Sequence, residues 1–214
     1  MTAATTLERI GELGVVPVVT VHDVAHAAPV ATALAAGGLP CAEVTLRTSA
    51  GLDAVASIAT SHVDVLVGAG TVLSADQAEE AHAAGASFVV TPGYADDVVA
   101  WGADHDVLVL PGVMTPTEMM RAIAAGVTVA KLFPAQVAGG TALLDAVRSV
   151  FPSLRFVPTG GVAADNLADY LTRPNVLACG GSWMVDAADV AAGDVARIEQ
   201  RARAAAEAVR SVRR

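Results

Sequence analysis

The stretch VDVLVGAGTVLSADQAEEAHAAGASFVVTP, residues 63–92, decides the fold. It opens on a β-branched apolar run, continues through an alanine-rich segment from Ser74 to Gly85, and closes on a second apolar run. A serine with Gln77 three residues later is typical of a helix amino terminus, and glycine often follows the last residue of a helix. The stretch therefore predicts a strand, a helix and a second strand, the unit from which parallel sheets are built.

The same unit recurs along the chain. Gly37 and Gly126 are predicted to close two further helices as left-handed caps, and Thr115 with Glu118 repeats the capping pattern. The β-branched runs begin at Val15, Cys41, Val63, Ser87, Val107, Val127, Leu154 and Val176. Eight such units predict a (β/α)8 barrel of the TIM type, with a doubly wound sheet as the alternative.

The organisation along the chain indicates a single domain. No linker or change of composition divides it, so we expect residues 1–214 to form one barrel. The segment before Val15 predicts a helix that covers one end of the barrel, and the segment from Val195 predicts a closing helix. Hydrophobic residues make up 54% of the chain and charged residues 16%, which is enough for a sizeable core.

Charge and composition exclude several classes of function. The net charge is −9 and no basic patch is visible, which argues against a nucleic-acid partner. No apolar run is long enough for a membrane span, and the amino terminus lacks the pattern of a signal peptide. Cys41 and Cys179 lie apart in apolar runs, so we expect buried thiols in a reducing cytoplasm. His22 and His26 lack a third ligand, and we expect no metal.

The run VTVAKLFPA, residues 127–135, holds the chain's single lysine, Lys131; every other basic side chain apart from histidine is an arginine. Side chains alternate along a strand, so Lys131 shares a face with Val129 and Phe133 near the carboxyl end, where barrel enzymes have their chemistry. A neutral amine attacks ketones, whereas a guanidinium stays protonated. Lys131 is therefore either a nucleophile or a remnant of a coding bias toward arginine.

The run CAEVTLRT, from Cys41, is predicted to place charged side chains inside the barrel. By the same alternation, Glu43 and Arg47 belong to the inner set and lie at the mouth. Charged groups enter a core only when they are paired or used. Two interpretations stay open: an ion pair that stabilises the mouth, or a site with Glu43 as proton carrier and Arg47 as anion clamp.

Glycines follow three of the predicted strands. Gly68 and Gly70 leave room for a ligand after the third strand, and Thr71 adds a hydroxyl. Residues 159–161 follow the seventh strand and residues 180–182 the eighth, which is where barrels often bind phosphate. Ordinary tight turns are the alternative for each glycine pair.

The motifs EVTLRT, GAGTVL, KLFPA, PTGG and GGSW, in this order, resemble the class I aldolases that act on 2-dehydro-3-deoxy-6-phosphogluconate (KDPG). That family also includes the 4-hydroxy-2-oxoglutarate (KHG) aldolases. The resemblance runs from Val15 to Val185 and implies a lyase of the Entner–Doudoroff pathway that yields pyruvate and glyceraldehyde 3-phosphate. It also implies a cytoplasmic homotrimer that needs no cofactor.

The resemblance also implies roles for individual residues. Lys131 would form the Schiff base and Glu43 would move protons, through a water. The substrate-binding set, which holds the pyruvate carboxylate, shapes the pocket and meets the hydroxyl-bearing carbons, is Arg47, Thr71, Pro92, Phe133 and Thr159. The phosphate-binding set is Gly160, Gly161, Gly180, Gly181 and Ser182.

Two positions depart from the family pattern. Gln136 stands where many relatives carry glutamate and is expected to be peripheral, and Tyr94, in place of leucine, is expected at the mouth. The galactonate epimer of KDPG and KHG are alternative substrates. A non-catalytic phosphosugar-binding barrel is a further alternative, although it would need neither Lys131 nor Glu43. A pyridoxal-phosphate barrel usually carries its lysine near the first strand, and none lies there.

Overall fold

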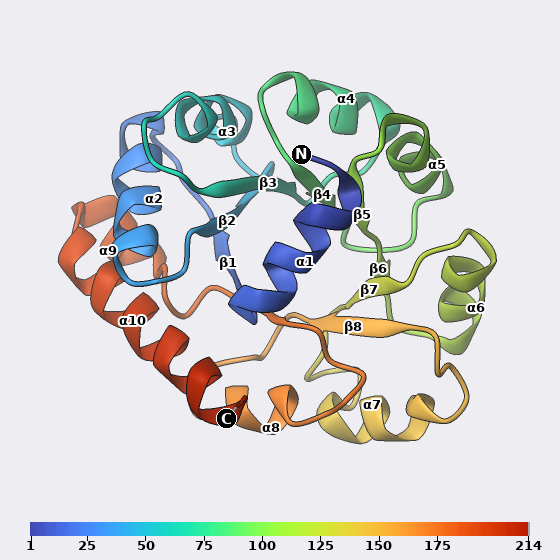
Figure 1. Cartoon of the computed structure of the whole chain (residues 1–214). Coiled ribbons are helices and arrows are strands. Elements are labelled where there is room, and N and C mark those ends of the chain that lie inside the picture. Colours follow the sequence, from blue (N-terminus) through green and yellow to red (C-terminus); the bar gives the residue numbers. More distant parts are fainter. Residues whose placement is uncertain (214) are drawn as a thin grey trace.

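The computed structural model describes residues 1–213, and Figure 1 looks along the axis of its barrel. All strand pairs of these residues are parallel. The strands are β1 (Val15–Val19), β2 (Cys41–Thr45), β3 (Leu66–Gly70), β4 (Phe88–Val90), β5 (Leu108–Leu110), β6 (Gly112–Val113), β7 (Val129–Leu132), β8 (Arg155–Pro158) and β9 (Cys179–Gly181). They form a six-stranded sheet in the order β5-β4-β3-β2-β1-β9 and a three-stranded sheet in the order β6-β7-β8.

Two seams join these sheets into a ring. At the first, β5 and β6 are the two halves of the fifth strand, separated by Pro111, which has no N–H to donate to a ladder. At the second, isolated bridges pair Phe156 with Val176 and Thr159 with Gly180. The result is a closed barrel of eight strand positions, which confirms the predicted (β/α)8 fold.

Helices surround the ring, apart from α1, which lies across it, and most of them connect one strand to the next (Figure 1). They are α1 (Ala3–Leu13), the 3-10 turn η1 (Val24–His26), α2 (Ala27–Ala36), α3 (Gly51–Ala59), α4 (Ala75–Ala83), α5 (Asp96–His105), α6 (Pro116–Ala124), α7 (Gly140–Arg148), α8 (Leu167–Leu171), α9 (Ala187–Ala192) and α10 (Val195–Val212). None of the helices within residues 1–213 has the length and apolar character that a bilayer span requires.

The predicted helix starts are confirmed. The Ser74 side chain accepts a hydrogen bond from the backbone N–H of Gln77 at the start of α4. Thr115 and Glu118 form a reciprocal capping box at the start of α6, where the glutamate accepts from the backbone N–H of the threonine at 2.7 Å. These contacts satisfy backbone donors that a helix leaves without an internal partner.

The left-handed conformation predicted for the helix-ending glycines is confirmed at two of three positions. Gly85 and Gly126 have φ of 103° and 80°, the left-handed region that glycine enters at little cost. Gly37 does end α2 as its C-cap, but the left-handed conformation predicted for it is wrong, because its φ is −75° and Gly38 takes that conformation instead, with φ of 87°. A Cβ on Gly37 would overlap Ala202 of α10, so this glycine allows two helices to approach closely.

Alternating side chains divide the core into two clusters. Inside the barrel lies an apolar set to which Cys41 and Val129 belong. Between strands and helices lies a larger set that includes Ala42, Val44 and Leu132. The faces assigned to the second and sixth strand positions from sequence are therefore confirmed.

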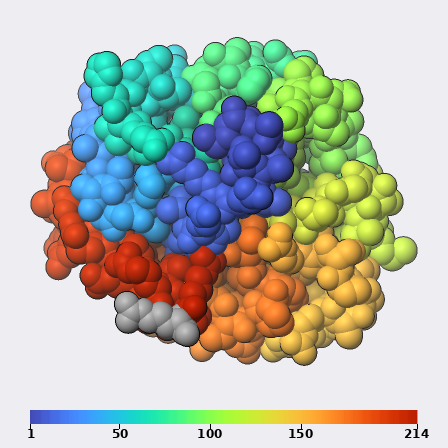
Figure 2. Space-filling view, viewed as in Figure 1, coloured from blue at the N-terminus to red at the C-terminus, as the bar shows by residue number. Residues whose placement is uncertain are grey.

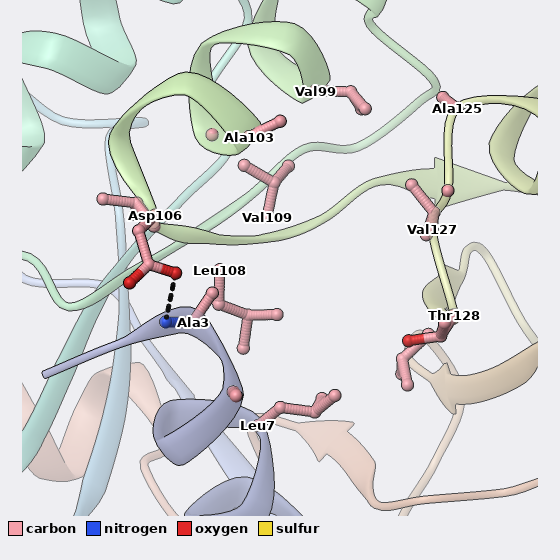
Figure 3. A pocket seen from close by; sticks show the side chains of 15 residues that line it. Ala3, Leu7, Val99, Ala103, Asp106, Leu108, Val109, Ala125, Val127 and Thr128 are labelled. Atoms are coloured by element: carbon pink, nitrogen blue, oxygen red, sulfur yellow. Dashed lines mark hydrogen bonds between the residues drawn. The ribbon is translucent and has the colours of Figure 1, made fainter.

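Helix α1 closes the amino-terminal end of the barrel, as predicted. It crosses the middle of the ring in Figure 1 and covers the centre of this face in Figure 2. Its Ile10 is fully buried in the inner cluster, with Leu7 and Leu13 packed beside it. A cavity of about 340 Å³ lies beside the helix (Figure 3), where Asp106 Oδ1 accepts a hydrogen bond from the Ala3 N–H at 3.2 Å.

Candidate active site

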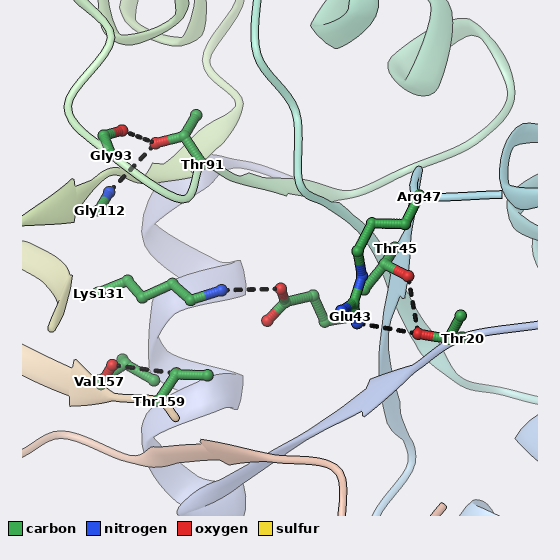
Figure 4. A network of polar contacts seen from close by, with 10 residues as sticks. All are labelled: Thr20, Glu43, Thr45, Arg47, Thr91, Gly93, Gly112, Lys131, Val157 and Thr159. Atoms are coloured by element: carbon green, nitrogen blue, oxygen red, sulfur yellow. Dashed lines mark hydrogen bonds and ion pairs between the residues drawn. The ribbon is translucent and has the colours of Figure 1, made fainter. Parts of the chain in front are cut away.

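The two predicted catalytic side chains meet in the barrel interior. Strands β2 and β7 lie four positions apart in a ring of eight, so their inner faces look at each other across the axis. Lys131 Nζ donates to Glu43 Oε1 at 3.1 Å (Figure 4), and the two residues are only 6% and 3% exposed. An amine and a carboxylate that are both removed from water need this kind of mutual contact, because an unpaired buried charge is strongly unfavourable.

The glycines of β3 make space for this pair. A Cβ on Gly70 would overlap the Glu43 carboxylate, and a Cβ on Gly68 would overlap the Phe88 ring. The space that was expected to admit a ligand is thus filled by side chains of the protein. A glycine at position 70 is what allows Glu43 to extend toward Lys131.

Phe133 and Pro92 lie on the lysine's side of the barrel. The Phe133 ring centroid is 5.1 Å from Lys131 Nζ, which is within cation–π range. Gly112 is the register partner of Lys131 on β6, and a Cβ there would overlap the Pro92 backbone. Phe133 therefore lies near the amine, and Pro92 lies against the strand that pairs with the Lys131 backbone.

Thr91 is a residue of this region that the sequence interpretation missed. Its buried hydroxyl donates to Gly93 O at 2.6 Å and accepts from Gly112 N at 3.1 Å (Figure 4). It thereby fastens the turn at Pro92 to the strand beside Lys131. The only signal in the sequence was a hydroxyl directly before a Pro-Gly turn.

Arg47 differs from its prediction in one respect. Strand β2 ends at Thr45, so Arg47 lies in the following turn and is exposed, not buried on the inner face. Its guanidinium still turns to the mouth, where Nη2 donates to Thr20 Oγ1 at 3.0 Å. Thr20 Oγ1 lies 2.9 Å from Thr45 Oγ1 (Figure 4). Thr20 was also missed from sequence.

Thr71 follows β3 with a φ of 61°. A β-branched residue in the left-handed region is a genuine outlier, since its side chain crowds its own backbone. Such strain is concentrated at functional sites, where the surrounding structure holds it. The backbone thus supports the choice of Thr71 as a site residue.

The predicted phosphate loops lie side by side. Thr159 is bridged to Gly180, and a Cβ on that glycine would overlap the Thr159 hydroxyl. A Cβ on Gly181 would overlap the Trp183 ring, while Ser182 is exposed. Side chains packed closely against the glycine backbone explain both glycines, and the Thr159–Gly180 bridge joins the loops after β8 and β9.

Gln136 is exposed, as expected of a peripheral residue, but it contacts the first glycine loop. Its backbone N–H donates to Gly160 O at 2.9 Å, and its side-chain Oε1 accepts from the Tyr170 hydroxyl at 3.0 Å. Gly160 and Gly161 have φ of 92° and 82°, and a Cβ on Gly161 would overlap the Gln136 side chain. Gln136 therefore packs against the first glycine loop and hydrogen-bonds to it.

Tyr94 packs against α6. Its hydroxyl donates to Arg121 O at 3.4 Å, and the Arg121 guanidinium lies 5.2 Å from the ring centroid. Partial burial and the nearby Asp96 carboxylate raise the pKa of Tyr94 above its usual value. Tyr94, which departs from the family pattern, thus contacts Arg121 of the adjacent helix.

The two cysteines are free and buried, as predicted. Burial is the largest cause that raises the pKa of each thiol, to about 12 for Cys179. Both thiols therefore stay protonated near neutral pH and are poor nucleophiles.

A parallel barrel with a buried lysine against a carboxylate near its carboxyl end is the arrangement that a Schiff-base lyase requires. A family model described as KDPG and KHG aldolase matches residues 7–201. The chain belongs to this aldolase family.

Named relatives agree with this assignment. The chain is 48% identical to a 2-dehydro-3-deoxy-phosphogluconate aldolase of Treponema pallidum, over 91% of this chain and 92% of the relative. It is 47% identical to the Pseudomonas aeruginosa enzyme of the same name, over 92% and 89%. It also matches a KDPG aldolase structure from Legionella pneumophila, with pyruvate captured as a covalent carbinolamine. That match has a TM-score of 0.90 and 35% identity and covers 93% of this chain and 97% of the other.

Proposed function

We propose that this protein is a class I aldolase that reversibly cleaves KDPG to pyruvate and glyceraldehyde 3-phosphate. The observation that carries the proposal is the contact of 3.1 Å between Lys131 Nζ and Glu43 Oε1 inside the barrel. Lys131 is the chain's one lysine, so its side chain is the single side-chain amine. Relatives named for this reaction support the choice of substrate.

The reaction begins with transfer of a proton from the Lys131 ammonium to Glu43, which leaves a neutral amine. Lys131 Nζ attacks the C2 ketone, Glu43 gives its proton to the hydroxyl of the resulting carbinolamine, and loss of water leaves a protonated imine beside the regenerated Glu43 carboxylate. The imine withdraws electrons from the C3–C4 bond. Glu43, directly or through a water, takes the proton of the C4 hydroxyl, the C3–C4 bond breaks, and glyceraldehyde 3-phosphate leaves.

The remaining enamine is then converted to pyruvate. Glu43 returns a proton to C3, so the electron pair of the broken bond ends in a new C–H bond. Water adds to C2, pyruvate leaves, and Lys131 regains its amine. One carboxylate serves as base and acid in turn, which fits its place beside the amine.

The other site residues bind the two ends of the substrate. Arg47 and Thr71 hold the carboxylate, while Pro92 and Phe133 shape the pocket around the imine carbon and Thr159 meets the hydroxyl-bearing carbons. The phosphate lies on the loops that hold Gly160, Gly161, Gly180, Gly181 and Ser182. Positive φ at the first glycine pair supports this assignment, because backbone N–H groups without a Cβ nearby suit a phosphate.

Two other substrates are supported by relatives. A relative of Escherichia coli, 42% identical, is named KHG/KDPG aldolase, and a solved structure named KDPGal matches with a TM-score of 0.85 and 27% identity. The glycine loops favour a phosphorylated substrate over KHG. Measuring kcat/KM for KDPG, its galactonate epimer and KHG in parallel ranks them, and a preference for KHG would contradict the phosphate assignment.

We further propose that the protein works as a homotrimer in the cytoplasm. A designed cage built from fused symmetric oligomeric domains matches 94% of this chain with a TM-score of 0.86, which supports an oligomer. Buried free thiols fit a reducing compartment. Light scattering after size-exclusion chromatography measures the subunit number directly.

Trapping with borohydride tests the proposed reaction. Pyruvate and borohydride together should add one reduced pyruvate to the protein, and peptide mapping should place it on Lys131. The matched control is Lys131→Arg, which has no side-chain amine and should stay unlabelled under the same conditions. Pyruvate binding without an adduct would instead favour the non-catalytic phosphosugar-binding barrel.

A further inference from the structure

The Arg47 guanidinium is a cation at the barrel mouth without an acidic partner. Within residues 1–213 it forms no ion pair with a carboxylate, and the hydrogen bond that anchors it is the 3.0 Å contact from Nη2 to Thr20 Oγ1. Its side chain lies past the end of β2 and is exposed. An exposed arginine with one anchor depends on that anchor for its position.

Thr20 is itself fixed by a buried group. Its Oγ1 lies 2.9 Å from the hydroxyl of Thr45, which is 1% exposed and stands two residues after Glu43 on the inner face of β2. A hydroxyl has one proton to donate and two lone pairs to accept. Thr20 can therefore accept from Arg47 and still hydrogen-bond to Thr45, so the three side chains form one chain of contacts (Figure 4).

This chain of contacts lowers the conformational freedom of Arg47 before a ligand arrives. A free arginine side chain has many rotamers and loses that freedom when it binds a ligand. Its guanidinium carries five N–H donors, and the contact with Thr20 leaves the others for a planar anion such as a carboxylate. Ordering the clamp in advance favours affinity, because less freedom is lost at the moment of binding.

We propose that Thr20 is a positioning residue for recognition of the keto-acid carboxylate. Its hydroxyl holds Arg47 over the mouth, and Thr45 provides the fixed point in the strand that also carries Glu43. The inference rests on the proposed function, in which Arg47 binds this carboxylate. Since the carboxylate does not change during C–C cleavage, losing the anchor weakens ground state and transition state alike and acts on KM, not kcat.

Three single variants test the anchor. Thr20→Val removes the hydroxyl at nearly constant shape and should raise KM for KDPG roughly three- to tenfold, with kcat within about twofold. Thr20→Ser keeps the hydroxyl and should retain the parent KM. The control is Thr32→Val on α2, whose exposed hydroxyl donates to Ala28 O at 2.9 Å far along the chain from Arg47, and its KM should not change.

A double-mutant cycle tests whether Thr20 changes KM by positioning Arg47 or by a general change in the structure of the barrel mouth. Arg47→Ala alone should raise KM, and adding Thr20→Val to it should change KM no further. An unchanged KM for Thr20→Val, or an equal increase in both backgrounds, overturns the inference. An unchanged KM for Arg47→Ala overturns it too, yet leaves the aldolase intact if borohydride still labels Lys131. Absence of labelling in the parent protein overturns the proposed function itself.

Discussion

The same strands build both ends of the barrel, but one end contributes to stability and the other carries the proposed catalytic residues. On β2, apolar Cys41 precedes Glu43 by two residues, and on β7 Val129 precedes Lys131 by two residues. Such pairs point to the same face about 7 Å apart along the strand. The first member of each pair belongs to the apolar inner cluster that Ile10 of α1 closes, whereas the second member reaches the mouth.

Residues that stabilise the fold and residues proposed for catalysis therefore lie only a few ångströms apart on the same strands. The closed end buries apolar area, which stabilises the fold at roughly 25 cal/mol per Å². The open end buries an ion pair, whose Coulombic attraction is largely offset by the loss of hydration, so it adds little stability. We therefore expect substitutions at one end to change catalysis and substitutions at the other to change the free energy of unfolding.

Lys131→Arg should give the largest effect. Arginine keeps a positive charge against Glu43 but forms no imine, so kcat should fall by at least about 1,000-fold while the melting temperature changes little. A coupled assay for pyruvate release and a thermal melt measure the two quantities. Parent-like cleavage by this variant would refute the assigned nucleophile.

Glu43→Gln comes next. The amide keeps the shape and can still accept a hydrogen bond, yet it cannot move a proton, so kcat should fall by about 100- to 10,000-fold. Borohydride should still trap pyruvate on Lys131, more slowly. Full turnover would remove Glu43 from the mechanism and return it to the alternative of a purely stabilising ion pair.

Ile10→Ala tests the closed end. Removing a fully buried side chain there should lower the free energy of unfolding by about 2–5 kcal/mol, with kcat/KM unchanged at temperatures where the protein is folded. Denaturant unfolding checks the first value. Val150→Ala, at a site that is 65% exposed, is the control and should stay within about 0.5 kcal/mol of the parent. A large loss of activity in the folded Ile10 variant would break the separation between the ends.

Thr91→Val tests a residue that is expected to affect both stability and catalysis. Without the hydroxyl, Gly112 N is buried without its acceptor, which should lower stability by about 1–3 kcal/mol. Because Gly112 lies in register with Lys131, kcat should fall as well. Thr91→Ser retains the contact and should retain both properties. Loss of stability with full activity would assign Thr91 to the fold alone.

Substitution of Glu118, at the start of α6, should change the free energy of unfolding least. Burial raises its pKa, but hydrogen bonds from Met114 N and from Thr115 outweigh this and hold the pKa below the usual value. A lowered folded-state pKa contributes stability above the unfolded pKa, and that stability is lost as pH falls through the folded pKa. Glu118 is only partly buried, so solvent screens this contribution. Glu118→Gln should therefore cost no more than about 0.5 kcal/mol near pH 7, and progressively less as the pH falls through the folded-state pKa, as measured by urea unfolding. A constant difference across this range would contradict the assignment.

Regular strands made the barrel and its central pair predictable. Alternation placed Glu43 and Lys131 inward, and the order of the strands placed them opposite each other. The same rule failed for Arg47, because β2 ends at Thr45 and alternation does not extend into a turn. Thr20 and Thr91 could not be identified from sequence, since their partners are 27 and 21 residues away and meet them only when the ring closes.

The split of the fifth strand at Pro111 has a mechanical consequence. Glu43 lies in the six-stranded sheet and Lys131 in the three-stranded one, so their contact is a crosslink between two separately laddered walls. In the proposed mechanism the protonated imine keeps a positive charge beside the Glu43 carboxylate, so this crosslink persists in the adduct. The Lys131 backbone N–H also donates to Pro111 O at 2.9 Å at the first seam, and the Phe156–Val176 and Thr159–Gly180 bridges close the second, so the two walls stay joined while the covalent bond forms and breaks.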